Sequence, residues 1–157
     1  MNRRFLQLAR ARTTCKGNEV ADMTIRYSNP SGLAKPLGAY SHISRARASE
    51  IVFIAGQLAV NEAGDLIGKG DFAAQMRQVF ENLKRALESE GLNFASVTRF
   101  TTYLVHSQDI EAFMAVRKEL FARIYPGGQY PPNTLLMVDR LVGEQFLIEV
   151  ETIAVAA

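Results

Sequence analysis

The sequence predicts an α+β fold in which two helices lie on one face of a mixed β-sheet. Two stretches of the 157-residue chain repeat apolar residues with a helical period of about 3.6 residues. Short runs rich in β-branched and aromatic residues lie before, between and after these stretches, in the order ββαβαββ. Runs of strand with two inserted helices are typical of a sheet that carries both helices on one side. The opposite side of the sheet then needs cover, which we expect other copies of the chain to supply.

The first strands are predicted over residues 40–46 and 51–58, joined by a short polar turn. The second run is apolar over most of its length, as in a buried strand. Residues 24–27 are a candidate opening strand. Because a domain with only two helices cannot cover such an apolar run on both faces, we expect two further copies to complete a homotrimer.

The first helix is predicted to follow Asp71, which suits the N-cap position, and to stop at Gly91, a residue type that favours helix ends. Its apolar stripe consists of Phe72, Met76, Val79, Phe80, Leu83 and Leu87. The segment 97–105 is rich in Thr, Phe and Tyr and is therefore predicted to be a strand.

The second helix is predicted over residues 109–125, and Pro126 followed by two glycines ends it. Two strands over residues 134–141 and 146–155 close the chain around a turn at residues 142–144. No linker rich in proline and glycine divides these elements, so they are expected to form one domain.

The composition excludes several classes of protein. Apolar residues make up 48% of the chain and charged residues 22%, values typical of a globular protein. No apolar run reaches the roughly 18 residues that a membrane-spanning helix needs. A single cysteine, Cys15, and two distant histidines, His42 and His106, give no metal-ligand spacing. We therefore expect neither a metal site nor a membrane partner.

The excess of positive charge belongs to the N-terminal segment. Residues 1–22 hold five basic and two acidic side chains, a charge of +3, which leaves −1 for residues 23–157 out of the net +2. A body of that charge argues against a nucleic-acid partner. The segment lacks the apolar stretch of an export signal, so an organellar transit peptide and a disordered extension remain as interpretations. We favour the disordered, dispensable extension of a cytoplasmic protein whose single folded domain spans residues 23–157.

Three separated segments place polar groups where a purely structural sheet would not need them. Tyr40 lies just before a predicted strand, and Gly56 and Gln57 interrupt an apolar one. The last strand carries Glu149 and Glu151 on a face that it shares with apolar residues. Carboxylates on such a face lie at a solvent-exposed edge or serve in chemistry.

The segments 38–42, 55–57 and 148–154, in this order and spacing, resemble the motifs of the RidA/YjgF proteins, also called the endoribonuclease L-PSP family. The resemblance covers nearly all of residues 23–157. It implies a chorismate-mutase-like α+β fold, a homotrimer, and clefts between subunits that bind small molecules. The best-studied branch of the family hydrolyses reactive enamines and imines to keto acids and ammonia, without a metal or a bound cofactor.

The resemblance also implies roles for individual residues. Tyr40 would donate a hydrogen bond to the substrate, Glu149 would position or activate a water molecule, and Gly56 and Gln57 would line the wall of the site. Asn133 occupies the position of the arginine that holds the substrate carboxylate in the deaminase branch. Asparagine offers neutral hydrogen bonds in place of a charged bidentate fork, so we expect weaker carboxylate binding or a different ligand.

Arg117 is a candidate replacement for that arginine. It falls inside the apolar stripe of the second helix, which consists of Ile110, Phe113, Arg117, Leu120 and Ile124. In the family the matching position is commonly an asparagine near the cleft, which suggests an exchange of Arg and Asn between positions 117 and 133. The alternatives are a structural ion pair, for example with Glu149, or a side chain that extends to solvent.

Three functions follow from this reading. The leading one is hydrolysis of small enamine or imine metabolites in clefts between subunits. The second is a trimeric protein that binds a small molecule without catalysis. The third, a ribonuclease or inhibitor of translation, is disfavoured by the charge of the body and by the lack of an RNA-recognition motif.

Overall fold

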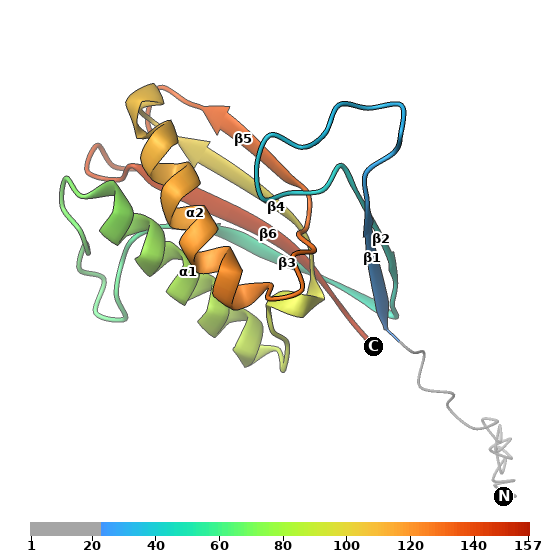
Figure 1. The fold of residues 1–157 in the computed structure, drawn as a ribbon. Coiled ribbons are helices and arrows are strands. Elements are labelled where there is room, and N and C mark those ends of the chain that lie inside the picture. The colour runs from blue at the N-terminus through green and yellow to red at the C-terminus, as the bar shows by residue number, and fades with distance from the viewer. Residues whose placement is uncertain (1–22) are drawn as a thin grey trace, which may run out of the picture.

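The computed structural model describes residues 23–157, and the predicted extension over residues 1–22 lies outside them. Its strands are β1 (Thr24–Ser28), β2 (Ile43–Arg47), β3 (Glu50–Gln57), β4 (Val97–Leu104), β5 (Asn133–Met137) and β6 (Ile148–Ala156), and its two α-helices are α1 (Phe72–Ser89) and α2 (Ile110–Ile124). Both helices lie side by side on one face of the larger sheet (Figure 1), so the predicted α+β fold is confirmed. Neither helix is long and apolar enough to cross a membrane.

The larger sheet is mixed and has the strand order β3-β6-β4-β5. Strand β6 runs antiparallel to both β3 and β4, whereas β4 and β5 run parallel and are connected through α2. The two segments predicted as the last strands are therefore not neighbours, because β4 lies between them. Strand β5 also ends at Met137, before the predicted residue 141, since the chain leaves the sheet soon after Val138 donates a 2.9 Å hydrogen bond to the Leu104 carbonyl.

Strands β1 and β2 form a separate antiparallel pair. The polar turn after β2 does not make a hairpin with β3, because β3 pairs with β6. Strand β2 begins at Ile43, later than the predicted residue 40. The backbone nitrogen of His42 donates to the side chain of Asn29 at 2.9 Å, so residues 40–42 form a loop held by a side chain.

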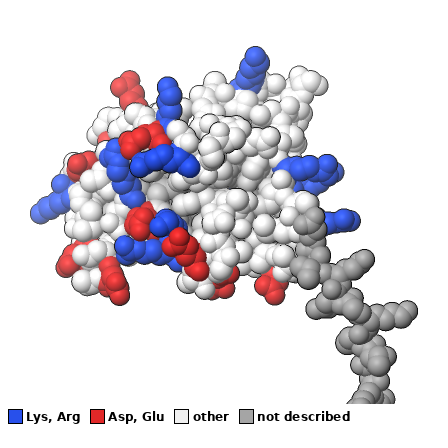
Figure 2. Space-filling model, turned by 60° about the horizontal axis from the view of Figure 1, so that its bottom comes forward, with Lys and Arg blue, Asp and Glu red and all other residues white. Residues whose placement is uncertain are grey.

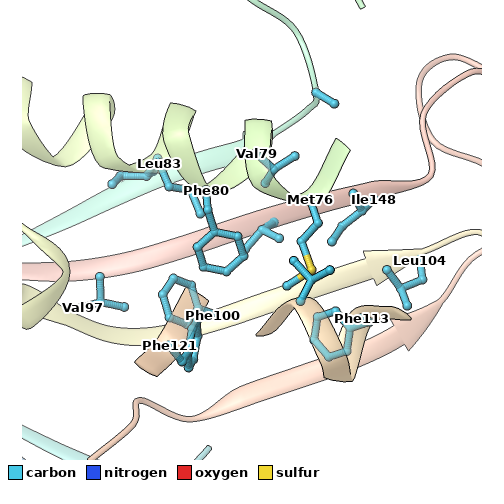
Figure 3. Packing of buried hydrophobic residues seen from close by; sticks show 14 of the residues in the cluster. Met76, Val79, Phe80, Leu83, Val97, Phe100, Leu104, Phe113, Phe121 and Ile148 are labelled. Atoms are coloured by element: carbon cyan, nitrogen blue, oxygen red, sulfur yellow. The ribbon is translucent and has the colours of Figure 1, made fainter. Parts of the chain in front are cut away.

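The core lies between the helices and the sheet, as Figure 3 shows. All six residues of the predicted stripe on α1 are buried. The carboxylate of Asp71 accepts a 2.9 Å hydrogen bond from the Ala74 nitrogen, which confirms the N-cap, and Gly91 adopts a φ of 69° just beyond the helix. The buried face of α2 differs in part from the prediction, because it consists of Phe113, Val116, Arg117 and Phe121, while Ile110 is exposed.

The face of the sheet opposite the helices is uncovered in a single chain. Val52 and Ile54 of β3 turn toward the helices, so the alternating residues Ile51 and Phe53 turn away. These two side chains are 63% and 73% exposed. The open face therefore presents large apolar groups to its surroundings, and its cover by other copies stays a prediction.

Candidate functional site

Three of the predicted site residues line one small cavity of about 270 Å³. Tyr40 comes from the loop before β2, Arg117 from the middle of α2, and Asn133 from the first position of β5. The other side chains around the cavity are mainly apolar: Leu37, Ile110, Phe113, Met114 and Leu135. The fold thus brings together polar groups that lie far apart in the sequence, among mainly apolar side chains.

Arg117 is the most deeply buried of these polar groups, with 3% of its surface exposed. Its Nε donates a 3.1 Å hydrogen bond to the Ala39 carbonyl, and its guanidinium carbon lies 4.2 Å from the centroid of the Phe121 ring and 5.5 Å from that of Phe113. Neither Nη1 nor Nη2 has a hydrogen-bond partner among the residues that the structure describes. Burial lowers the pKa of Arg117 to about 10, so the group is still charged at neutral pH.

Of the two alternatives for Arg117, extension to solvent is wrong, because the side chain is buried. Within residues 23–157 of one chain, its Nη groups meet no carboxylate.

Asn133 is held by the neighbouring strand. Its Oδ1 accepts a 2.8 Å hydrogen bond from the hydroxyl of Thr102 in β4, whose side chain is buried on the helix side of the sheet. Because Oδ1 already accepts this hydrogen bond, Asn133 offers its amide nitrogen to the cavity, as a hydrogen-bond donor. The replacement of arginine by asparagine thus leaves a neutral donor with a fixed orientation.

Tyr40 lies between this cavity and a larger one of about 620 Å³, which is lined by the loop over residues 29–41 together with Gly128 and Tyr130. Its ring meets that of His42 edge to face, with centroids 5.8 Å apart. Among the residues that the structure describes, its hydroxyl accepts only a long 3.5 Å hydrogen bond, from the Leu37 nitrogen, and donates none, so its proton can be donated to a ligand.

Glu149 lies on the open face of the sheet, away from the cavity. Its neighbours in β6, Ile148 and Val150, are buried against the helices, which places Glu149 on the other side. Its carboxylate lies directly over Gly56, where an added Cβ would overlap it. Burial raises the pKa of Glu149, and the charge of Glu151 raises it further.

Around Glu149 the open face is hollowed. The hollow has a volume of about 430 Å³, and Tyr103, Arg140 and Glu151 also line it.

Gln57 lines neither the cavity nor the hollow. Its Nε2 donates a 3.1 Å hydrogen bond to the Ala55 carbonyl of its own strand, so in a single chain it satisfies a backbone group. It borders a separate hollow that Asn82 and Arg85 of α1 also line.

The sheet thus separates the predicted site into two parts within one chain. Tyr40, Arg117 and Asn133 lie on the helix side, whereas Gly56 and Glu149 lie on the open side. Residues 23–157 contain no group of three or more His, Cys, Asp or Glu side chains that could hold a metal ion. The helix side offers hydrogen-bond donors and a guanidinium, and the open side offers a carboxylate.

Two features of the site were missed in the sequence. The rings of Phe113 and Phe121 flank the guanidinium of Arg117, and the spacing of four residues on either side of Arg117 could have indicated this contact. The hydrogen bond from Thr102 to Asn133 had no such signal, because it depends on the parallel pairing of β4 with β5.

Comparison with known proteins gives consistent results. Residues 32–156 match the family model described as Endoribonuclease L-PSP. The chain is 31% identical over 113 residues to the 3-aminoacrylate deaminase RutC of Acinetobacter baylyi, a match that covers 72% of this chain and 88% of the relative.

Two solved structures are similar as well. A protein of unknown function of the Rid family, YyfB from Yersinia pestis, superposes with a TM-score of 0.74 and 33% identity, covering 83% of this chain and 98% of that one. TdcF of E. coli, solved with bound serine, has a TM-score of 0.61 and 27% identity, covering 68% and 81% of the two chains.

Proposed function

The chain belongs to the endoribonuclease L-PSP family, and from this membership we propose that it hydrolyses small reactive imines or enamines to keto compounds and ammonia. The deaminase activity in the name of the Acinetobacter relative supports this choice, and so does the small amino acid bound to the E. coli neighbour.

The proposed reaction adds one water molecule to the substrate and releases ammonia. In the imine form, the oxygen of water bonds to the C=N carbon, the carbon–nitrogen bond breaks, and nitrogen leaves as ammonia after taking up the protons of water. The imine carbon is already electrophilic, so the site has to hold the substrate, orient it and direct one water molecule at that carbon.

The observation that carries the proposal is the position of Glu149. Its carboxylate is half-buried on the bare backbone of Gly56, and burial raises its pKa. A carboxylate with a raised pKa is a better base toward water than an exposed one. We assign to Glu149 the positioning and activation of the attacking water. Tyr40 and Asn133 supply hydrogen bonds to the substrate, and Gly56 makes room for the carboxylate.

A complete site requires two copies of the chain, because Glu149 and Tyr40 lie on opposite sides of the sheet. When the open face of one copy packs on another, its Glu149 can lie beside the cavity of the neighbour. The exposed Ile51 and Phe53 supply the apolar contact for this association, and a homotrimer closes it.

The test follows the imine directly. An L-amino-acid oxidase releases imino acids, and semicarbazide traps them as semicarbazones that absorb in the ultraviolet. We expect the protein to reduce the rate of semicarbazone formation, and the variant Glu149→Gln, checked for the same oligomeric state, to lose this effect. An unchanged rate with several amino acids of different side chains would overturn the proposal.

Binding without catalysis is the second candidate. It is favoured by Asn133, because a neutral amide stands where the deaminase branch has its arginine. In the same assay, a wild-type protein that binds keto or amino acids but leaves the semicarbazone rate unchanged would support this function.

The helix side of the protein gives no support to a ribonuclease. In Figure 2, basic and acidic side chains lie interleaved over the helices. Several of them are paired, as in the contacts of Glu119 with Arg77 at 2.6 Å and with Arg123 at 2.9 Å. Binding to a phosphate backbone needs clustered, unpaired basic groups.

A further inference from the structure

Thr102 is a polar residue within the apolar face of β4. It lies between the core residues Phe100 and Leu104, and only 1% of its surface is exposed. A threonine in such a place needs an acceptor for its hydroxyl proton, because a buried O–H group without a partner destabilises the fold. Among residues 23–157 that hydroxyl has one partner, the Oδ1 of Asn133 at 2.8 Å. Thr102 is thus connected to the wall of the cavity that Asn133 lines.

The register of the sheet produces this contact. In the parallel pair of β4 and β5, Asn133 lies opposite Phe100, and Leu135 lies opposite Thr102. Asn133 and Thr102 therefore lie on the same face of the sheet, on neighbouring strands. Because Thr102 is branched at Cβ, few rotamers are open to its side chain. The hydroxyl thus has a fixed position on a strand that is paired on both sides.

The hydroxyl proton of Thr102 determines which end of the Asn133 carboxamide faces the cavity. A carboxamide that turns by half a rotation exchanges the places of its oxygen and its nitrogen. In the turned state the nitrogen of Asn133 would donate to the Thr102 oxygen, and the buried hydroxyl proton would lose its acceptor. The observed state pairs that proton and leaves the NH2 group for the cavity. Position 133 therefore offers the cavity a donor and not an acceptor.

We propose that Thr102 is a positioning residue, which holds the Asn133 NH2 group toward the cavity and so selects ligands that place an oxygen acceptor there. This inference rests on the proposed function for the choice of site. Thr102 itself does not line the cavity, so its hydroxyl acts on the ligand only through Asn133. Without that hydroxyl the carboxamide is free to turn. It then presents its own oxygen to the ligand for part of the time, which weakens binding.

The test measures binding and does not depend on turnover. The keto acid 2-oxobutanoate, a product of the proposed kind, is titrated into the full chain by calorimetry. Thr102→Val keeps the branched shape without the hydroxyl, and we expect it to weaken binding about threefold to tenfold, the usual contribution of one hydrogen bond. Thr102→Ala also lacks the hydroxyl and repeats the comparison with a smaller side chain. Thr102→Ser keeps the hydroxyl and should bind nearly as well as the wild type.

A double-mutant cycle separates a positioning residue from a structural one. Asn133→Ala removes the NH2 group itself and should weaken binding at least as much as Thr102→Val. In the Asn133→Ala background, Thr102→Val should cause no further loss, because the hydroxyl no longer has a carboxamide to hold. A residue that serves only the fold would weaken binding equally in both backgrounds.

Thr98→Val is the matched control. It removes a hydroxyl from the same strand, one that donates to the Ile153 carbonyl at 3.0 Å and does not line the cavity. This variant should leave the affinity for 2-oxobutanoate unchanged.

Imine hydrolysis gives a second readout. The contact with Asn133 holds the substrate before and during the reaction, so its loss removes binding that the ground state and the transition state share. Thr102→Val should therefore raise KM and leave kcat nearly unchanged. Melting temperatures of all variants keep effects on folding apart from effects on binding.

Four results would overturn the inference: no binding of 2-oxobutanoate by the wild type, wild-type affinity in Thr102→Val, wild-type affinity in Asn133→Ala, or an equal loss from Thr102→Val in both backgrounds. Failure of the proposed function looks different. Binding that depends on Thr102 through Asn133, in a protein that leaves the semicarbazone rate unchanged, would support the positioning role and contradict hydrolysis.

Discussion

The carboxylate of Glu149 occupies the space over Gly56 that any side chain at position 56 would fill. The two residues lie on adjacent strands, β6 and β3, next to the point where the pairing register shifts between Ile54 and Gln57. The glycine therefore lets the carboxylate fold down onto the backbone, where it is half removed from water. This contact accounts for glycine at position 56 and belongs to the burial that, together with the charge of Glu151, raises the pKa of Glu149.

Gly56→Ala should displace the Glu149 carboxylate while the fold survives, because the overlapping atoms belong to the end of a flexible side chain. We expect a loss of imine hydrolysis of about tenfold or more, as for a misplaced catalytic group, with little change in melting temperature. Gly127→Ala is the matched control, since nothing lies within 4 Å of a Cβ at that position. Full activity in Gly56→Ala would show that the position of Glu149 is unimportant.

The raised pKa of Glu149 makes a prediction about stability and pH. A carboxyl whose pKa is higher in the folded than in the unfolded chain favours folding below its unfolded value of about 4.5 and loses that contribution as pH rises through the folded value. Glu149→Gln should therefore raise the melting temperature at pH 7.5 and have little effect at pH 4. Glu151→Gln removes only the smaller cause of the shift and should give a smaller gain. An equal gain at both pH values would contradict the assignment.

The exposed ring of Phe53 predicts how the chain associates. Phe53→Lys places a charge on the apolar part of the open face that β3 presents and should convert the expected trimer to monomers, measured by light scattering at micromolar concentration. Ser89→Lys places the same charge at the exposed end of α1, on the helix side of the sheet, and should leave the assembly intact. A wild-type monomer at these concentrations would contradict the composite site.

Gln75 is expected to stabilise the fold, although its polar side chain gave no sign in the sequence that it is buried. It is fully buried in α1, where its amide nitrogen donates to the carbonyls of Gly68 and Gln145 and its oxygen accepts from the Leu147 nitrogen at 2.8 Å. Gln75→Leu leaves these backbone groups unpaired and should lower the free energy of unfolding by about 2–4 kcal/mol in urea titrations. Gln78→Leu, only half-buried on the same helix, should cost less than half as much.

The parts of the fold that depend on local sequence were predicted well. The stripe and caps of α1 need only neighbouring residues, so periodicity and Asp71 locate the helix. The order of strands in the sheet is not local, and nothing in the last two strand segments shows that β4 lies between them.

The same distinction applies to the site. The position of Arg117 within the apolar stripe of α2 follows from spacing along one helix, and its burial bears this out. The separation of Glu149 from Tyr40 and Asn133 follows from which residues of β6 turn toward the helices, and this depends on packing across the whole sheet. Contacts such as the one between Thr102 and Asn133 depend in the same way on strand pairing.

The exchange of arginine and asparagine between positions 117 and 133 can be tested by reversing it. Asn133→Arg alone should lower the melting temperature. The substitution breaks the hydrogen bond with Thr102 and brings a second positive charge into the cavity beside Arg117. Arg117→Asn alone should remove the carboxylate anchor and lower kcat/KM for imine hydrolysis.

If both positions serve one carboxylate, the double variant should recover part of what Arg117→Asn loses, because the new arginine can hold the same group from β5. The two substitutions would then be coupled, and the double-mutant cycle in kcat/KM would depart from additivity by a factor of about three or more. Melting temperatures of all four proteins keep folding effects apart from binding. Additive losses would mean that position 133 does not reach the ligand that Arg117 holds, and the exchange would then be wrong even if Arg117 binds a carboxylate.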